Sequence, residues 1–137
     1  MQRTATAVWQ GTGKEGNGTL TTQSGALNEA PYNFVSRFEK GGDTNPEELI
    51  AAAHAGCFNM KLSFVVGNSG YTPDHLETTC TITMGDGEIT NALLELTASI
   101  PGMSEDEFEE AVTDAVTNCP ISKLFDVDIS VEAELEV

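Results

Sequence analysis

The sequence predicts an α+β fold in which antiparallel sheets wrap around one long buried helix. Short strand-forming segments separated by turns fill the first third of the chain. Two segments with helical spacing follow, and strand patterns lie between and after them. This order of strands, helix, strands, helix and strand is typical of antiparallel α+β proteins. The chain of 137 residues is long enough for one core, so we expect a single domain over 1–137.

Three strands are expected in the first third, at 4–9, around 19–22 and at 33–38. The glycine-rich segment at 13–18 is predicted to form the turn between the first two strands. Arg37 is therefore expected on a strand, among aromatic and aliphatic neighbours. An unpaired charge there would be expensive to bury, so it needs a counter-ion.

A long helix is predicted from Pro46 to about Val66. Asn45 suits the cap, proline suits the first helical position, and Glu48 stands three residues after the cap. Polar and charged residues interrupt the apolar stretch, which favours a buried helix over a bilayer span. Because the helix is apolar on nearly every side and one small sheet cannot enclose it, we expect a homodimer that shares the burial.

The remaining elements are a hairpin, a second helix and a last strand. Leu76–Met84 and Glu88–Ile100 are predicted to pair across Gly85-Asp86-Gly87. Ser104-Glu105-Asp106-Glu107 is a capping box that opens an amphipathic helix, which Asn118-Cys119-Pro120 breaks. Residues 127–137 alternate apolar and polar side chains without error, as a half-buried strand does.

Composition excludes several classes of partner. The formal net charge is −16, from 22 acidic against 6 basic residues. Such a surface repels phosphate backbones and anionic headgroups, so we expect neither nucleic acid nor membrane as a partner. The first fifteen residues contain no apolar run of the ~7–15 residues an export signal needs. We therefore expect a reducing, cytoplasmic location for the three cysteines.

Two cysteines are candidates for chemistry. Cys57 lies between apolar residues and also suits a core position. Cys119 precedes Pro120 at a helix break, where free backbone N–H groups favour the reactive thiolate. They stand 62 positions apart without CxxC or HxxxH spacing, so we expect no metal and no other cofactor. Cys80 shares a strand face with Leu76 and Ile82, which favours core packing.

Other polar residues leave alternatives open. His54 precedes Cys57 by three residues, and a Cys–His pair suggests a cysteine-dependent hydrolase. A non-enzymatic module that binds apolar ligands is a second alternative. Arg37, with Glu47 or Glu48 as counter-ion, forms either a structural ion pair or a device that activates a thiol and polarises an O–O bond. The residues alone do not decide between these readings.

Five segments share their pattern with a known family, and they are spread over the chain. They are Ser24-Gly25-Ala26-Leu27, Pro31-Tyr32-Asn33-Phe34, Arg37-Phe38-Glu39, the block from Thr44 to Phe58, and Asn118-Cys119-Pro120-Ile121-Ser122. Together they resemble the OsmC/Ohr peroxidases, the osmotically inducible and organic hydroperoxide resistance proteins. The resemblance is closer to the OsmC branch and covers essentially the whole chain.

The resemblance implies an intertwined homodimer with two active sites at the subunit interface. It implies a thiol-dependent peroxidase in which Cys57 attacks an organic hydroperoxide and Cys119 resolves the product. By position in the motif, Arg37 and Glu47 activate Cys57. An external dithiol, on a lipoyl-bearing protein or a small thiol, then reduces the pair. An apolar mouth that prefers organic peroxides to hydrogen peroxide is expected from Phe34, Phe38, Phe58 and Met60.

The spacing between Glu47 and Cys57 constrains this mechanism. Ten residues of straight helix rise by about 15 Å, which is too far for an ion pair at Glu47 to reach the thiol. Either the helix breaks near Ala55-Gly56, or Glu47 acts on the cysteine of the other subunit. We expect the break, because Gly56 weakens a helix. A break would place Cys57 at a new helix N-terminus, where the dipole lowers the pKa of a thiol.

Overall fold

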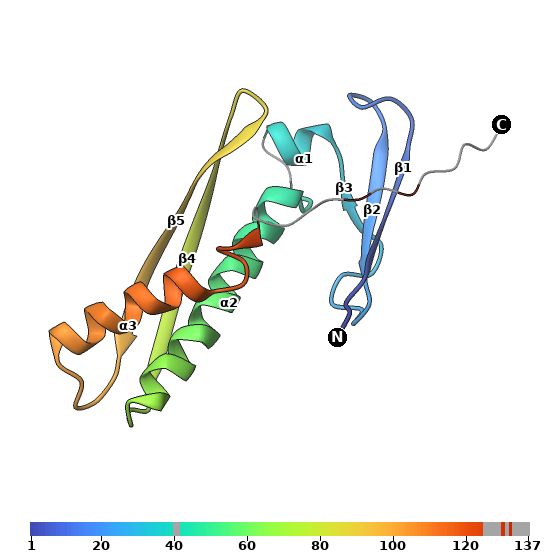
Figure 1. The fold of residues 1–137 in the computed structure, drawn as a ribbon. Coiled ribbons are helices and arrows are strands. Elements are labelled where there is room, and N and C mark those ends of the chain that lie inside the picture. The colour runs from blue at the N-terminus through green and yellow to red at the C-terminus, as the bar shows by residue number, and fades with distance from the viewer. Residues whose placement is uncertain (40–41, 125–129, 131, 133–137) are drawn as a thin grey trace. The chain divides into compact units, whose positions relative to one another are not determined.

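The structure, a computed structural model, describes residues 1–39, 42–124, 130 and 132. Its strands pair antiparallel in a three-stranded sheet and a hairpin, and helices connect them, so the predicted α+β class is confirmed (Figure 1). The chain divides into two compact units. The first comprises Met1–Ala52 with Ile82–Ala92, and the second Ala53–Thr81 with Leu93–Val137. A single domain over 1–137 stays a prediction.

The first unit contains a sheet of three strands in the order β1-β2-β3, namely Ala5–Gln10, Asn17–Thr22 and Ala30–Tyr32. The first two strands confirm the prediction. Gly18 of β2 pairs with both Trp9 and Tyr32. A Cβ there would lie 2.6 Å from each aromatic ring, so only glycine lets the two rings close over the strand, with centroids 5.3 Å apart.

The strand predicted over 33–38 is wrong, because Phe34–Phe38 forms a short helix, α1. The Asn33 side chain accepts a hydrogen bond from the Ser36 N–H, and the Ser36 hydroxyl accepts one from the Asn33 N–H. This capping box satisfies free N–H groups locally and outweighs the strand preference of the aromatic and branched side chains. Arg37 therefore lies in the last turn of a helix.

Helix α2 runs from Pro46 to Asn68 without interruption. Its start is as predicted, since the Asn45 side chain accepts from the Glu48 N–H at 2.8 Å. The predicted break near Gly56 is wrong. One glycine costs a helix only about 1 kcal/mol relative to alanine. The run Ala51–Ala53 has the highest helix propensity, and side chains after Gly56 are anchored in the core, which offsets that cost.

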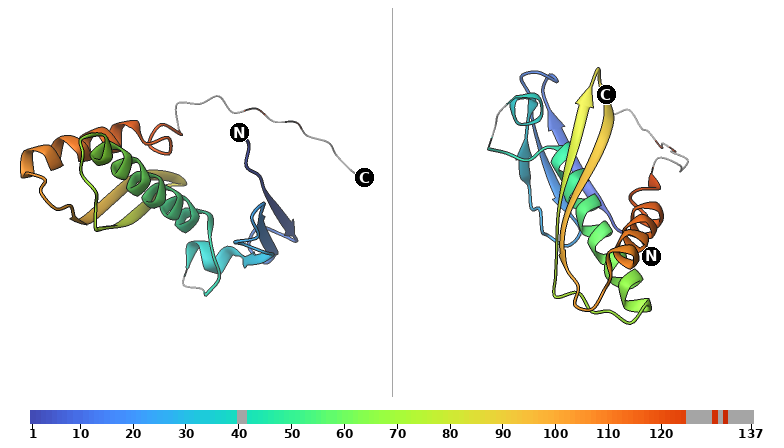
Figure 2. Two further views of the ribbon diagram at one scale, coloured as in Figure 1. Left: turned by 90° about the horizontal axis from the view of Figure 1, so that it is seen from below. Right: turned by 90° about the vertical axis from the view of Figure 1, so that its left-hand side faces the viewer.

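The core lies in the second unit. Phe58, Leu62 and Val66 form one stripe of α2 and meet Ala111 and Ala115 of α3, the helix Glu105–Asn118. Partly buried apolar side chains of the strands and loops pack against this cluster, namely Tyr71, Leu76, Leu94, Leu96, Ile100 and Met103. Figure 2 shows both helices on one side of the hairpin. The amphipathic helix predicted after Ser104 thus buries Ala111 and Ala115 in the core, whereas Val116 of the same helix is 40% exposed.

The hairpin consists of β4, His75–Gly85, and β5, Glu88–Ser99. Its turn residues Asp86 and Gly87 have φ of 54° and 80°, as a two-residue type I′ loop requires. The predicted hairpin is confirmed, as is the Ser104 capping box that opens α3. The last strand predicted over 127–137 lies outside the described residues, apart from Ser130 and Glu132.

The described residues do not enclose helix α2 on all sides. Met60 and Phe64 are each 64% exposed, whereas Leu62 between them is fully buried. By length and a mean hydropathy of 1.4, α2 also meets the criteria for a membrane-spanning helix. Its buried stripe belongs to the protein core, and its first turn carries Glu47 and Glu48, which fits a core helix of an α+β domain better than a bilayer span.

Candidate active site

Arg37 and Glu47 form an ion pair inside the first unit. The Arg37 Nε–H donates to Glu47 Oε1 at 2.9 Å, and a terminal guanidinium nitrogen reaches the same oxygen at 2.9 Å. Helix α1 places the arginine, and the first turn of α2 places the glutamate. Glu48, the other predicted counter-ion, instead accepts a hydrogen bond from Thr44. Two N–H groups on one oxygen fix the plane of the guanidinium.

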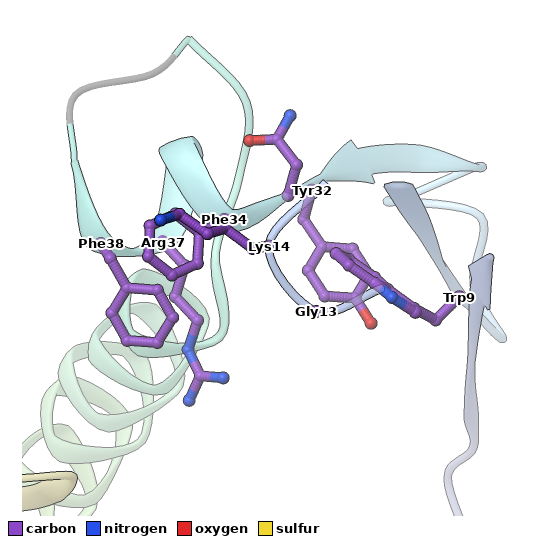
Figure 3. Close-up of a pocket in the computed structure, with 8 residues that line it drawn as sticks. Trp9, Gly13, Lys14, Tyr32, Phe34, Arg37 and Phe38 are labelled. Atoms are coloured by element: carbon purple, nitrogen blue, oxygen red, sulfur yellow. The ribbon is translucent and has the colours of Figure 1, made fainter. Parts of the chain in front are cut away.

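An apolar pocket of about 420 Å³ lies beside Arg37 in the same unit (Figure 3). Phe34 and Phe38 of α1 stand on one side of it with ring centroids 5.0 Å apart, and Trp9 and Tyr32 of the sheet stand on the other. The Arg37 guanidinium lies 5.0 Å from the centre of the Phe38 ring. The lining is thus aromatic, with two cations, Lys14 and Arg37, at its edge.

Of the four residues expected in an apolar mouth, Phe34 and Phe38 line this pocket. Phe58 does not, because it is only 1% exposed and belongs to the core of the second unit. Helical spacing explains the error. Phe58 stands four residues before Leu62 and eight before Val66, so it faces the same way as the core stripe. Met60 is exposed on another face of α2.

Cys57 and Cys119 meet inside the second unit, with their sulfurs 2.8 Å apart. Cys57 is half-buried in α2, and Cys119 is completely buried at the C-cap of α3. Both are free thiols. A further approach of about 1 Å would bring the sulfurs to the ~2.0 Å of a disulfide bond. The packing of α2 on α3 brings together two cysteines that stand 62 positions apart in the sequence.

The thiol of Cys119 is the more acidic of the pair. Burial acts to raise its pKa, but hydrogen bonds from Cys57, from the backbone N–H groups of Ser122 and Ile121, and from the Ser122 hydroxyl lower the pKa overall. The turn after Pro120 supplies these backbone donors. This is the arrangement of free N–H groups that the helix break before Pro120 predicts.

The pKa of Cys57 is raised, first by burial and then by its hydrogen bond to Cys119. The Ile121 N–H and the charge of Lys61, one turn further along α2, act in the opposite direction. The expected lowering by a helix N-terminus does not occur, because α2 is continuous through Cys57. Within one chain the groups around the pair therefore favour the thiolate of Cys119 over that of Cys57.

His54 contacts neither sulfur of this pair among the hydrogen bonds of the described residues. Its Nε2 lies 3.0 Å from the Ser122 hydroxyl, and its Nδ1 lies 3.9 Å from the Cys80 sulfur. The Cys57–His54 pairing that a hydrolase would need is replaced by a contact to the turn after Cys119. Cys80 is half-buried in β4 on the face of Leu76 and Ile82, as predicted.

Sequence reasoning missed three contributors to the thiol site, namely Ser122, Lys61 and the N–H of Ile121. A signal for Ser122 was present, since Cys119-Pro120-Ile121-Ser122 places a hydroxyl three residues after a thiol, within reach across one turn. In the described part of the chain, no group of three His, Cys, Asp or Glu side chains is placed to hold a metal ion. The two predicted pairs therefore both form, the thiols in the second unit and the ion pair in the first.

Comparison with known proteins decides the family. The model of the OsmC-like protein family matches residues 39–134, a range that includes three of the four predicted site residues. The chain is 39% identical over 134 residues to peroxiredoxin OsmC of Escherichia coli strain K12, covering 95% of this chain and 94% of that protein. The chain belongs to the OsmC family. The resemblance seen in its motifs is thereby confirmed.

This OsmC-family chain is also similar to organic hydroperoxide resistance proteins. It is 30% identical over 98 residues to organic hydroperoxide resistance protein-like 2 of Staphylococcus epidermidis, covering 69% of each protein. The crystal structure of the organic hydroperoxide resistance protein OhrB of Bacillus subtilis matches with a TM-score of 0.60 at 25% identity, over 97% of this chain and 98% of that one. This OsmC-family protein is a thiol-dependent peroxidase, as predicted.

Proposed function

We propose that this OsmC-family protein reduces organic hydroperoxides to alcohols, with Cys57 as the attacking thiol and Cys119 as the resolving thiol. The observation that carries the proposal is the 2.8 Å contact between the two sulfurs, one half-buried and one completely buried. A thiol that can meet peroxide must be reachable, whereas its resolving partner needs only to reach the oxidised sulfur. The names of its relatives, peroxiredoxin and organic hydroperoxide resistance protein, support this assignment.

The first step forms a sulfenic acid. The Cys57 thiolate attacks the distal oxygen of the hydroperoxide, the O–O bond breaks, and the alkoxide leaves and takes up a proton as the alcohol. Developing charge on the alkoxide needs a cation or donor nearby. Arg37 is suited to that task, because Glu47 holds its guanidinium in one plane.

The second step forms the disulfide. Cys119 attacks the sulfur of the Cys57 sulfenic acid, and water leaves. Cys119 already carries the more stabilised thiolate, so the resolving nucleophile is ready when the sulfenic acid forms. Rapid formation of the disulfide protects Cys57 from irreversible oxidation. An external dithiol, on a lipoyl-bearing protein or a small thiol, then reduces the bond and completes the cycle.

Arg37 and Glu47 act on the Cys57 of a partner subunit in this proposal. Because α2 is continuous, the ten residues from Glu47 to Cys57 rise by about 15 Å along its axis. This separation along the helix therefore favours a model in which Arg37 and Glu47 act on the Cys57 of the other subunit rather than on the Cys57 of their own chain. The exposed apolar face of α2, with Met60 and Phe64, supports a homodimer that buries this face.

Complementation between subunits tests this arrangement. Alone, Cys57→Ser is expected to be inactive and Arg37→Met to retain about one hundredth of the wild-type activity. When the two are unfolded together and refolded as mixed dimers, one of the two sites regains both Cys57 and Arg37 if the sites are shared. Recovery of about a quarter of the wild-type activity is expected from random pairing, since half of the dimers are mixed and each carries one intact site. No recovery would place both residues in one subunit.

The apolar pocket beside Arg37 supports organic rather than hydrogen peroxide as substrate. Its aromatic lining from Trp9, Tyr32, Phe34 and Phe38 offers an apolar group a place out of water. Equal efficiency on cumene hydroperoxide and hydrogen peroxide would contradict this preference. A reducing, cytoplasmic location is part of the proposal, since the thiols must be returned to the free state in which they stand here.

A stoichiometric oxidation tests the whole cycle. One equivalent of cumene hydroperoxide is added to reduced protein, and the thiols are mapped by intact mass and peptide analysis. We expect loss of two hydrogens, a link between Cys57 and Cys119, and reversal by a dithiol. No oxidation, or oxidation centred on Cys80, would contradict the proposal.

A further inference from the structure

A line of polar side chains leads from Cys80 to the buried thiol. The Cys80 sulfur lies 3.9 Å from His54 Nδ1, and His54 Nε2 lies 3.0 Å from the Ser122 hydroxyl. Ser122 stands in the turn that follows Cys119 and Pro120, and its hydroxyl is among the groups that lower the pKa of Cys119. Strand β4, helix α2 and the turn after Pro120 each contribute one of the first three groups, and all four lie in the second unit. The peroxidase reaction described above assigns no role to Cys80 or His54, and uses Ser122 only as one of the groups that stabilise the Cys119 thiolate.

The direction of these hydrogen bonds follows from the tautomer of His54. A neutral imidazole donates from one nitrogen and accepts at the other. If Nδ1 accepts from the Cys80 thiol, Nε2–H donates to the Ser122 oxygen, and the Ser122 hydrogen is left to point at Cys119. In the opposite tautomer Ser122 would donate to His54 and would have no hydrogen for the sulfur. Only the first tautomer leaves the Ser122 hydroxyl a hydrogen that it can donate to Cys119.

Burial of Cys80 favours the first tautomer. It raises the pKa of the Cys80 thiol, which therefore keeps its proton at neutral pH and remains a donor. A thiol is a weak donor and 3.9 Å is a long contact, so its influence is on the choice of tautomer more than on energy. The contact of His54 with Ser122, at 3.0 Å, is the strong one in the line.

We propose that His54 is a positioning residue for the resolving thiol, acting through Ser122, and that Cys80 fixes its tautomer. The proposal rests on the function proposed above and adds residues to its second step. In that step the Cys119 thiolate attacks the Cys57 sulfenic sulfur, the S–S bond forms and the S–O bond breaks. The departing hydroxide is protonated by a solvent hydronium ion, which balances the proton that Cys119 released when it ionised, and it leaves as water. Ser122 holds Cys119 as an oriented thiolate until then.

Single-turnover kinetics test the role in resolution. Formation of the sulfenic acid and of the disulfide are followed separately after mixing reduced protein with cumene hydroperoxide, by trapping with dimedone and by mass. Ser122→Ala is expected to slow disulfide formation about tenfold or more while sulfenic acid forms at nearly the wild-type rate, since a hydrogen bond to a charged sulfur is lost. Ser122→Thr, which keeps the hydroxyl, is expected to restore most of the rate.

Matched changes at the other two positions separate positioning from packing. His54→Gln retains an N–H that can donate to Ser122 and is expected to resolve faster than His54→Leu. Cys80→Ala is expected to slow resolution only about two- to threefold, because its donor is weak, and Cys80→Ser to remain nearer wild type. An equal loss in both chemical steps, or no difference between Ser122→Ala and Ser122→Thr, would overturn the proposal.

A measurement on the reduced protein keeps this inference independent of peroxidase activity. In a Cys57→Ser, Cys80→Ser background, Cys119 is the one remaining thiol, and the ultraviolet absorbance of its thiolate is read at neutral pH. Ser122→Ala is expected to lower that absorbance and Ser122→Thr to preserve it. Unchanged absorbance in Ser122→Ala would overturn the proposal even if the peroxidase cycle is correct. Absent oxidation of Cys57 in the wild type would instead overturn the proposed function.

Discussion

The two compact units differ in how many of their side chains are buried by residues of the same unit. Within the described ranges, the six buried apolar residues, from Phe58 to Cys119, all belong to the second unit. Among the described residues of the first unit, Ser36 and two glycines are buried, and all six residues of β1 are exposed. The second unit therefore holds its side chains in place by itself, whereas the first depends on local capping, strand pairing and one ion pair.

The reactive groups divide along the same line. The thiols lie where packing is dense, so their 2.8 Å separation follows from the fold of one chain. Arg37, Glu47 and the aromatic pocket lie where packing is thin, and Arg37 is 39% exposed. The comparison indicates that a single chain is sufficient to position the thiol pair, while Arg37 and Glu47, the groups proposed to activate Cys57, lie where their own unit buries little. A homodimer is the proposed source of further cover.

The largest expected effects are on peroxidase activity, and they differ between substitutions of the two thiols. Cys57→Ser removes the nucleophile and is expected to lower peroxidase activity by at least about a thousandfold. Cys119→Ser is expected to complete one turnover and then accumulate Cys57 sulfenic and sulfinic acid, because no disulfide can form. Steady-state consumption of cumene hydroperoxide and intact-mass analysis measure both. Sustained turnover in Cys119→Ser without over-oxidation would remove the resolving role.

A smaller loss is expected in the first unit. Arg37→Met is expected to reduce kcat about a hundredfold, because charge on the departing alkoxide loses its partner. Arg37→Lys keeps the charge but not the planar contact to Glu47 and is expected to fall between Arg37→Met and wild type. Lys14→Met is the matched control, since Lys14 is the other cation beside the pocket. If Lys14→Met loses as much as Arg37→Met, general charge rather than Arg37 is responsible.

The core should respond more to substitution than the surface of the same unit. Leu62→Ala, at a fully buried position, is expected to lower the free energy of unfolding by about 2–5 kcal/mol. Thr113→Ala on the exposed face of α3 is the control and is expected to change it by less than about 0.5 kcal/mol. Urea unfolding monitored by circular dichroism measures both. A Leu62→Ala loss as small as that of the control would mean that α2 does not pack in solution as it does here.

The sheet of the first unit offers a test of the proposed cover. Val8 of β1 is 50% exposed in one chain. An aspartate at an exposed strand position is nearly harmless, but in a dimer interface it buries an unpaired charge. Val8→Asp is therefore expected to weaken self-association about tenfold or more, as measured by sedimentation equilibrium. Unchanged association would show that β1 stays in contact with water and that the dimer forms elsewhere.

Most of the fold was predictable because its signals are local. The cap at Asn45, the box at Ser104 and the Asp86-Gly87 turn each depend on a few adjacent residues, and each formed as predicted. The segment 33–38 failed for the same reason, since its strand-like composition hid a capping box between Asn33 and Ser36. The continuity of α2 depended on core contacts that follow Gly56, which one glycine does not reveal.

The reactive residues of the candidate site were predictable from the sequence, whereas the groups that surround the thiols were less so. The two cysteines and the Arg37–Glu47 pair follow from a family motif, and the structure brings each pair together. The acidity of Cys119 relative to Cys57 depends on where the N–H groups of Ile121 and Ser122 point. The role of Ser122 depends on a contact with His54 across 68 residues. Neither is visible in a linear pattern.

The smallest expected effect is on the pH dependence of stability, and it involves the hydrogen bonds of Glu107 in the second unit. Glu107 accepts hydrogen bonds from the Ser104 backbone and from the Tyr71 hydroxyl, and these lower the pKa of its carboxyl. A carboxyl with a depressed pKa stabilises the folded state above its unfolded pKa of about 4.3, and this stabilisation is lost as the pH falls through the folded value. Glu107→Gln is therefore expected to lower stability slightly at pH 7 and to match the wild type near pH 3, as thermal unfolding at the two pH values measures. A deficit in Glu107→Gln that persists at pH 3 would assign the effect to packing of the side chain. A deficit confined to neutral pH would show that even the well-packed unit depends on a charged cap at the start of α3.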